Sequence, residues 1–126
     1  MIAEDSAMLR ELLKETLTEA GYADLQFIEN GKEAWDYFEN IAKSEEVLPE
    51  EEFQLIITDI EKPQMDGHHL TSKIKDYPRL RHIPIIIFSS LITNDLYRKG
   101  ERVGADAQVS KPEIMSLVQN IDALIL

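Results

Sequence analysis

Polar residues that could do chemistry follow four separate apolar runs of this chain. These runs, each with the residues that end it, are Met1–Ala3 with Glu4 and Asp5, Phe53–Thr58 with Asp59, Ile83–Phe88 with Ser89, and Ala107–Ser110 with Lys111. Because a parallel α/β sheet brings the carboxyl ends of its strands to one crevice, these side chains are expected to meet there. The crevice would then hold three carboxylates, one hydroxyl and one ammonium group.

Such a set of groups is typical of a site that binds a divalent metal ion and handles a phosphoryl group. Two carboxylates about 4 Å apart repel each other by about 4 kcal/mol at an effective dielectric constant near 20, so three of them need a bound cation or a retained proton. Oxygen ligands without nearby His or Cys favour Mg²⁺ or Mn²⁺. Beside such an ion Asp59 could attack phosphorus, while Lys111 neutralises one phosphoryl oxygen and Ser89 hydrogen-bonds another.

Each of these residues also has a simpler interpretation when it is taken alone. Asp5 could serve only as a helix cap, Ser89 only as a turn former, and Lys111 only as a surface lysine. Their joint position at the ends of separate strands favours the functional interpretation.

The elements that must position these residues alternate between strand and helix patterns. The expected strands are Met1–Ala3, Leu25–Glu29, Phe53–Asp59, Pro84–Ser89 and Asp106–Ser110. The expected helices run from a Ser6 cap to Gly21, over Glu33–Ala42, from Asp66 or His68 to Tyr77, from an Asn94 or Asp95 cap to Val103, and over Glu113–Ile125. Strands joined by helical crossovers run parallel, so the pattern predicts an α/β fold of the doubly wound (βα)5 type in three layers. The segment Lys43–Glu52 is expected to be a helix end followed by an exposed loop.

Length and composition set outer limits on function. The 126 residues fit one domain with a real core, and a formal net charge of −11 disfavours binding to nucleic acid. Without cysteine the chain has neither a disulfide framework nor a thiol nucleophile. No apolar run approaches the ~20 residues of a membrane span, and the start of the sequence shows no secretory pattern, so a cytoplasmic location is expected.

Three further residues draw attention as possible ligands or partners. His68 and His69 are adjacent at the start of a helix, so they face different directions and are expected at the surface rather than in a metal site. Trp35 shares its helical pattern with Phe38 and is expected in the core.

The strand-end residues lie in segments that together resemble the receiver domain of two-component response regulators, the CheY-like fold, over essentially the whole chain. The matching segments are E-D-S at 4–6, D-I-E-K-P-Q-M-D-G at 59–67, P-I-I-I-F-S-S at 84–90 and G-A-D-A-Q-V-S-K-P at 104–112. This resemblance implies a five-stranded parallel sheet of order 2-1-3-4-5.

The resemblance also implies a role for each residue of the site. Asp59 is expected to be the phosphoacceptor, with Asp5 a direct Mg²⁺ ligand, Glu4 acting on the ion through water, and the backbone carbonyl of Glu61 completing the metal shell. Ser89 resembles the Ser or Thr that moves to the phosphoryl group. Lys111 resembles the lysine of receivers, whose bond to the following proline, here Pro112, is expected to be cis.

Among receivers, the chain looks most like those of CheV-type chemotaxis coupling proteins. The similar stretches are residues 59–71 and 75–91, together with the long acidic segment Lys43–Glu52. Coupling proteins of this type carry a CheW-like domain ahead of the receiver. The resemblance therefore implies a single receiver domain over residues 1–126, excised from a longer chain, and a link to a chemoreceptor array through that domain.

Four positions bear on how this chain would differ from a usual receiver. Gln108 replaces the usual Tyr or Phe, so an aromatic switch cannot operate and any switching must use other contacts. Lys62 adds a cation close to the acidic residues, where it either weakens Mg²⁺ binding or simply points to solvent. Leu91 and Glu61 occupy the positions that tune loss of the phosphoryl group, and because leucine cannot orient a water molecule, slow self-dephosphorylation is expected.

Three functions remain open from the sequence. The first is a signalling receiver, phosphorylated on Asp59 by a CheA-like sensor histidine kinase, in which the face formed by the last two helices and the strand between them shifts between two states. The second is a degenerate receiver that acts as an interaction module without phosphorylation. The third, a Mg²⁺-dependent phosphatase, fits poorly because Glu61 stands where a second aspartate would be needed and the chain has no room for a cap domain.

Overall fold

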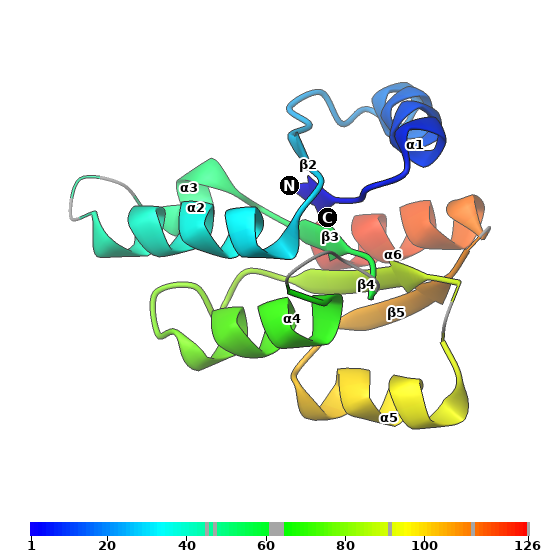
Figure 1. Cartoon of the computed structure of the whole chain (residues 1–126). Helices are drawn as coiled ribbons and strands as arrows, with labels where there is room; N and C mark the ends of the chain where they lie inside the picture. Colours follow the sequence, from blue (N-terminus) through cyan, green and yellow to red (C-terminus); the bar gives the residue numbers. More distant parts are fainter. Residues whose placement is uncertain (45, 47, 61–64, 91, 112, 126) are drawn as a thin grey trace.

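The computed structural model describes residues 1–44, 46, 48–60, 65–90, 92–111 and 113–125 (Figure 1). The strands within these ranges are β1 (Ile2–Ala3), β2 (Phe27–Ile28), β3 (Ile56–Thr58), β4 (Ile85–Ser89) and β5 (Ala107–Ser110). The helices are α1 (Ala7–Glu19), α2 (Gly31–Lys43), α3 (Pro49–Glu52), α4 (Gly67–Asp76), α5 (Asn94–Arg102) and α6 (Ile114–Ile125). The strands pair in parallel in the order β2-β1-β3-β4-β5, which confirms the predicted topology.

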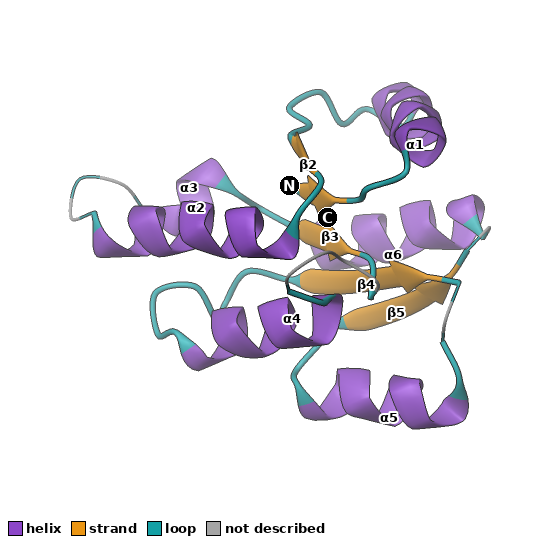
Figure 2. Ribbon diagram, viewed as in Figure 1, coloured by secondary structure: helices purple, strands orange, loops and turns teal. Residues whose placement is uncertain are grey.

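Each face of the sheet carries its own apolar core, because successive side chains of a strand point to opposite faces. One core lies under α2 and α4 and takes Ile56 and Ile85 from the sheet, while the other lies under α1 and α6 and takes Ile57 and Ile86. Helices thus cover both faces of the strands (Figure 2), and the three-layer prediction is confirmed. Trp35 is buried in the first core, as expected.

Helix α5 is attached differently from the longer helices. None of its residues, all of which are described, belongs to either apolar core, and only Gly100 among them is buried. Leu96 is half-buried and Tyr97 is exposed. The helix lies at the β5 end of the molecule, at the bottom of Figure 1.

The structure differs from the sequence prediction between α2 and β3. Within the segment expected to be an exposed loop, α3 forms a short helix with Pro49 in its first turn. Proline is tolerated there because amides of the first turn have no hydrogen-bond partner within the helix. The Phe53 amide donates a hydrogen bond to the Pro49 carbonyl and ends this helix, and the Phe53 ring packs with its centroid 5.0 Å from that of Phe38. Strand β3 therefore begins at Ile56 rather than at Phe53.

Several helix starts are fixed by side-chain caps. Ser6, the predicted cap of α1, accepts a hydrogen bond from the Leu9 amide. Asp66, one of the two predicted starts of α4, caps that helix by accepting from the His69 amide. Helix α2 begins at Gly31 after an Asn30 cap, earlier than the expected Glu33. The start expected for α5 was also wrong.

At that start, the hydroxyl of Thr93 is the cap and accepts from the Leu96 amide, so neither Asn94 nor Asp95 caps the helix. Asp95 lies instead in the first turn, where its negative charge is favourable at the positive end of the helix dipole.

The expected surface position of His68 was wrong. Its side chain is only 2% exposed, because α5 covers this part of α4 and the imidazole hydrogen bonds with the main chain of Leu96. Burial lowers the pKa of His68 below the usual 6.5, and the nearby Lys99 adds to the effect, while Asp66 and the bond to Leu96 oppose it. His69 is exposed, as expected.

Acidification is expected to destabilise the fold through His68. The unfolded chain takes up a proton on this residue near pH 6.5, whereas the folded chain does so only at lower pH, so the free energy of unfolding falls as the pH drops below about 6.5. Urea unfolding of the wild type and of His68→Leu between about pH 7.5 and 5 measures this effect. The free energy of unfolding should fall more steeply with decreasing pH in the wild type than in His68→Leu. The exposed His69→Leu variant should keep the wild-type dependence, and an unchanged slope in His68→Leu would contradict the prediction.

Candidate functional site

The candidate residues lie at the carboxyl edge of the sheet, where the strand registers bring them together. Ala3 pairs with Thr58, so Glu4 and Asp59 leave neighbouring strands side by side. Ser89 pairs with Ser110, and its carbonyl accepts a hydrogen bond of 3.0 Å from the Lys111 amide. The predicted convergence of these strand ends is thus observed.

Three carboxylates form a compact acidic cluster, defined here as Glu4, Asp5 and Asp59. One oxygen from each lies within 4.8 Å of the others. Glu4 and Asp59 are buried, at 2% and 7% exposed, whereas Asp5 is open to solvent. Two of the carboxylates therefore have little water around them to offset their mutual repulsion.

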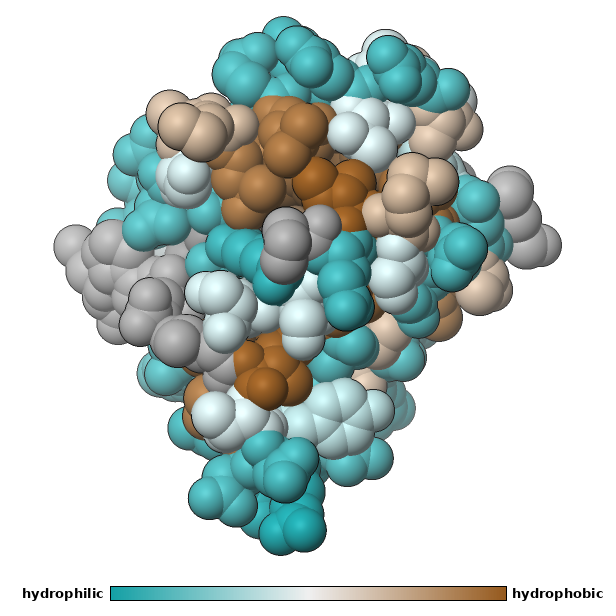
Figure 3. Space-filling view, turned by 90° about the vertical axis from the view of Figure 1, so that its right-hand side faces the viewer, coloured by the Kyte–Doolittle hydropathy of each residue, from teal (hydrophilic) through white to brown (hydrophobic). Residues whose placement is uncertain are grey.

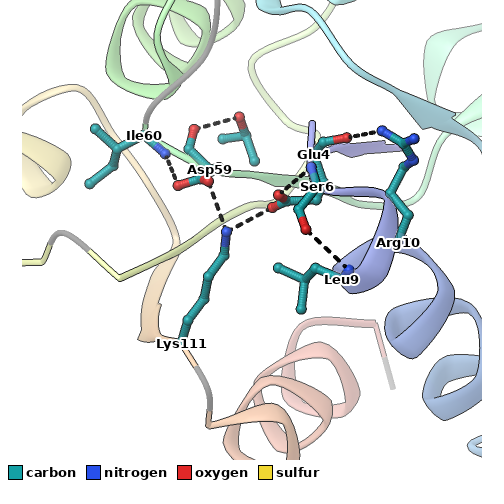
Figure 4. Close-up of polar contacts among 8 residues, drawn as sticks. Glu4, Ser6, Leu9, Arg10, Asp59, Ile60 and Lys111 are labelled. Atoms are coloured by element: carbon teal, nitrogen blue, oxygen red, sulfur yellow. Dashed lines mark hydrogen bonds and ion pairs between the residues drawn. The ribbon is translucent and has the colours of Figure 1, made fainter.

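Lys111 lies between the two buried members of the acidic cluster (Figure 4). Its ammonium nitrogen is 2.9 Å from Glu4 Oε2 and 2.8 Å from Asp59 Oδ2. Burial lowers the pKa of Lys111, but the hydrogen bonds and attraction from Asp59 and Glu4 outweigh burial and raise the pKa overall. The lysine is therefore charged at neutral pH and supplies a cation for the cluster from within the chain.

The Asp59 side chain is held firmly in one orientation. Its Oδ1 accepts a 2.7 Å hydrogen bond from the Ile60 amide while Oδ2 accepts from Lys111, and Thr58 Oγ1 donates to its main-chain carbonyl. The start of α4 presses against the same carbonyl, because a Cβ on Gly67 would lie 1.9 Å from that oxygen. Only glycine permits this approach, so Gly67 helps to set the position of Asp59 and was not singled out from the sequence.

Glu4 is positioned by contacts to the first helix. Its Oε1 accepts from the Ser6 amide at 3.1 Å, and its main-chain carbonyl accepts from Arg10 Nη1 at 3.0 Å. The second contact was missed by sequence reasoning, because Arg10 has no spacing that distinguishes it from a surface arginine. Asp5, by contrast, keeps its carboxylate facing solvent at the mouth of the site.

Ser89 is brought to the same edge and is fully buried as the last residue of β4. Around the site, the face at the carboxyl ends of the strands has a mainly hydrophilic centre below a hydrophobic area near α1 (Figure 3). Exposed apolar side chains include Met8 at the start of α1, Leu12 in the middle of that helix and Met115 at the start of α6.

The donor set of the acidic cluster suits a hard divalent cation. All three ligands are carboxylate oxygens at close range, which is what Mg²⁺ or Mn²⁺ prefers. A fixed aspartate, an ammonium group and an exposed carboxylate at one edge are also what an attack on phosphorus requires.

Comparison with known families agrees with this chemistry. A model of the response regulator receiver domain matches residues 1–122. The chain belongs to the response regulator receiver domain family. Receivers are signalling modules rather than enzymes that turn over an external substrate, and the predicted family is confirmed.

Similar proteins include chemotaxis receivers. The chain is 26% identical over 125 residues to chemotaxis protein CheV3 of Helicobacter pylori, covering 99% of this chain and 40% of that protein. It is 31% identical over 90 residues to CheY1 of the same species, covering 71% of this chain and 65% of CheY1. The chain thus spans less than two thirds of the length of each of these relatives.

Solved receiver structures share the fold. The signal receiver domain of a histidine kinase from Syntrophus aciditrophicus is 32% identical with a TM-score of 0.79, covering 98% of this chain and 86% of that one. In the described part of this receiver, no helix has the length and apolar character to cross a lipid bilayer.

Some expectations for this receiver lie outside the described residues. They are the Glu61 carbonyl as a metal ligand, the direction of Lys62, the position of Leu91 and the cis bond between Lys111 and Pro112. These expectations stay predictions.

Proposed function

We propose that this receiver accepts a phosphoryl group on Asp59 from the phosphohistidine of a CheA-like sensor histidine kinase in the cytoplasm. The observation that carries the proposal is the fixed Asp59 carboxylate, which shares the Lys111 ammonium with Glu4 beside the exposed Asp5. No other described group of three such residues offers ligand atoms this close together.

The chain's own residues would each contribute to the transfer. A carboxylate oxygen of Asp59 attacks phosphorus as the bond to the histidine nitrogen breaks, and Lys111 then neutralises charge on the transferred group. Ser89 would hydrogen-bond another phosphoryl oxygen from the end of β4. A bound Mg²⁺, held by Asp5, Asp59 and the Glu61 carbonyl with Glu4 nearby, would neutralise the remaining phosphoryl charge.

The surroundings of the site suit delivery by a protein. Met8 is 84% exposed at the start of α1 and Met115 is 69% exposed at the start of α6. The face that carries the site also has a contiguous hydrophobic area (Figure 3), and such an area favours docking of a partner. The output would be a shift of the face formed by α5, β5 and α6 between two states.

The sequence resemblance supports a wider assignment. We infer one receiver domain over residues 1–126 of a chemotaxis coupling protein, with a CheW-like domain ahead of it that links it to a chemoreceptor array. The similarity to CheV3, of which this chain covers 40%, supports this inference. Because Leu91 cannot orient water, the phosphoryl group would be lost slowly.

The experiment that tests the proposal is intact-mass measurement after incubation with acetyl phosphate. A gain of one phosphoryl group is expected with millimolar Mg²⁺ and none with excess EDTA, because Lys111 alone offsets one charge of three carboxylates and the cluster still repels an anionic donor. Removal of the donor then gives the lifetime of the phosphorylated form. A receiver of known activity, treated in parallel, serves as the control.

Failure to label under these conditions would favour the interaction module instead. One observation supports that alternative, because the Lys111 ammonium already pairs with both buried carboxylates, Glu4 and Asp59, from within the chain.

A further inference from the structure

Helix α5 is held to the molecule by polar side chains that reach its main chain. Gln108 Nε2, from strand β5, donates a hydrogen bond of 2.8 Å to the carbonyl of Tyr97. His68, from α4, hydrogen bonds with the main chain of the preceding residue, Leu96. Since α5 contributes nothing to either apolar core, these contacts decide where it lies.

The Gln108 amide also fits against the one buried residue of α5. A Cβ built on Gly100 would lie 2.2 Å from Gln108 Oε1 and 2.6 Å from Nε2. The amide therefore occupies the space that a side chain at position 100 would need. Glycine in the middle of a helix is unfavourable by itself, so its presence here is explained by the packing of this amide.

The arrangement leaves each of the two side chains only partly satisfied. Among the described residues, Gln108 Oε1 and His68 Nε2 are buried and have no hydrogen-bond partner. Buried polar atoms of this kind are costly, so a displacement of α5 that exposes them to water recovers part of what the lost bonds cost. The unsatisfied atoms therefore lower the free-energy cost of moving α5 away from the position seen here, which is a requirement for a switch.

Gln108 also lies near the phosphoryl site within the sheet. Gln108 is paired with Ile87, and Ser110 with Ser89. Because alternate residues of a strand share a face, Ser89 and Gln108 are diagonal neighbours on the same face of β4 and β5. If Ser89 moves toward a phosphoryl group, as the proposed function expects, the surroundings of the Gln108 side chain would change.

We propose that the Gln108 amide, seated against Gly100 and bonded to the Tyr97 carbonyl, is a latch that holds α5 in place and that phosphorylation at the neighbouring strand end releases. This proposal rests on the proposed function for its trigger, but the latch itself is a property of the unphosphorylated chain. It gives glutamine a role at a position where an aromatic switch cannot operate.

A double-mutant cycle on the full chain tests the latch without any phosphoryl group. Hydrogen exchange of the α5 amides is measured for the wild type, Gln108→Ala, Gly100→Ala and the double variant. Gln108→Ala should speed exchange roughly five-fold, as expected for one neutral hydrogen bond. Gly100→Ala should speed exchange only slightly, because the methyl group displaces the amide from its hydrogen bond while the helix preference of alanine offsets most of that loss.

The sign of the Gly100→Ala effect should reverse when Gln108 is already alanine. In that background the methyl group meets no amide, and the helix preference of alanine should slow exchange roughly two- to five-fold. Asn120→Ala is the matched control, because Asn120 Nδ2 also donates to a carbonyl, that of Ser116, but within a single helix. It should leave α5 unchanged, and additive effects of the two latch substitutions would overturn the proposal.

A second measurement addresses the trigger. Wild-type protein labelled with acetyl phosphate and Mg²⁺ should show faster exchange in α5 than unlabelled protein, whereas labelled Gln108→Ala should show no further increase. Labelled protein with unchanged α5 exchange would overturn the link to the phosphoryl site. If no protein can be labelled, the proposed function fails while the double-mutant cycle still decides whether the latch exists.

Discussion

Replacing Asp59 by asparagine is expected to abolish labelling by acetyl phosphate completely while leaving the fold intact. The amide retains an oxygen for the hydrogen bond from Ile60, so the local geometry is preserved. It carries no negative charge, however, and is a poor nucleophile toward phosphorus. Intact mass after incubation with Mg²⁺ and acetyl phosphate measures the effect, and circular dichroism confirms folding.

Asp66→Asn is the matched control for this substitution. Asp66 lies in the same connection between β3 and α4, but its carboxylate caps α4 instead of facing Lys111. Asparagine caps helices as well as aspartate, so this variant should label like the wild type. Labelling that survives in Asp59→Asn, or that is lost equally in both variants, would contradict the assignment of Asp59 as phosphoacceptor.

Replacing Lys111 by methionine is expected to destabilise the protein strongly in the absence of divalent ions. Removal of one partner from a buried ion pair typically costs about 3–5 kcal/mol, and here Glu4 and Asp59 would be left facing each other. Because both carboxylates are buried while Lys111 remains partly open to water, the lower end, about 3 kcal/mol in the free energy of unfolding, is expected. Urea unfolding in EDTA measures it.

Millimolar Mg²⁺ should restore more stability to Lys111→Met than it adds to the wild type. The ion binds the folded state only, and in the variant it no longer competes with the ammonium group for Glu4 and Asp59. Lys32→Met provides the control, since Lys32 is half-exposed and pairs with Asp36 on one turn of α2, where such a pair contributes only about 0.3–0.5 kcal/mol. Equal Mg²⁺ effects on the wild type and Lys111→Met would show that the ion and the lysine do not share these carboxylates.

The position of the site could be predicted because it follows from the topology of a parallel sheet and does not require knowledge of side-chain contacts. Strand ends of a parallel sheet meet at one edge, so Asp59 and Lys111 could be brought together from apolar runs alone. The strand order came from the resemblance to receivers rather than from these runs. The two cores follow from the strands, because alternate residues of β3 and β4 face opposite layers of helices.

What escaped prediction depends on contacts between distant segments. The burial of His68 arises because α5 lies over it, and adjacent residues at a helix start give no sign of that cover. The close approach of Gly67 to the Asp59 carbonyl, and of Gln108 to Gly100, likewise involves residues far apart in sequence or across a turn. The α5 cap was misassigned because Thr93, Asn94 and Asp95 are all acceptable caps in sequence, and the fold selects among them.

The separation of α5 from both apolar cores has a consequence for how such domains diversify. Substitutions on a surface that no core depends on usually change the free energy of unfolding by less than about 0.5 kcal/mol. Residues on the exposed side of α5, including Tyr97, can therefore be substituted with little change in the free energy of unfolding. A lineage can in this way acquire a new binding partner through one helix while the sheet and its strand-end chemistry are inherited unchanged.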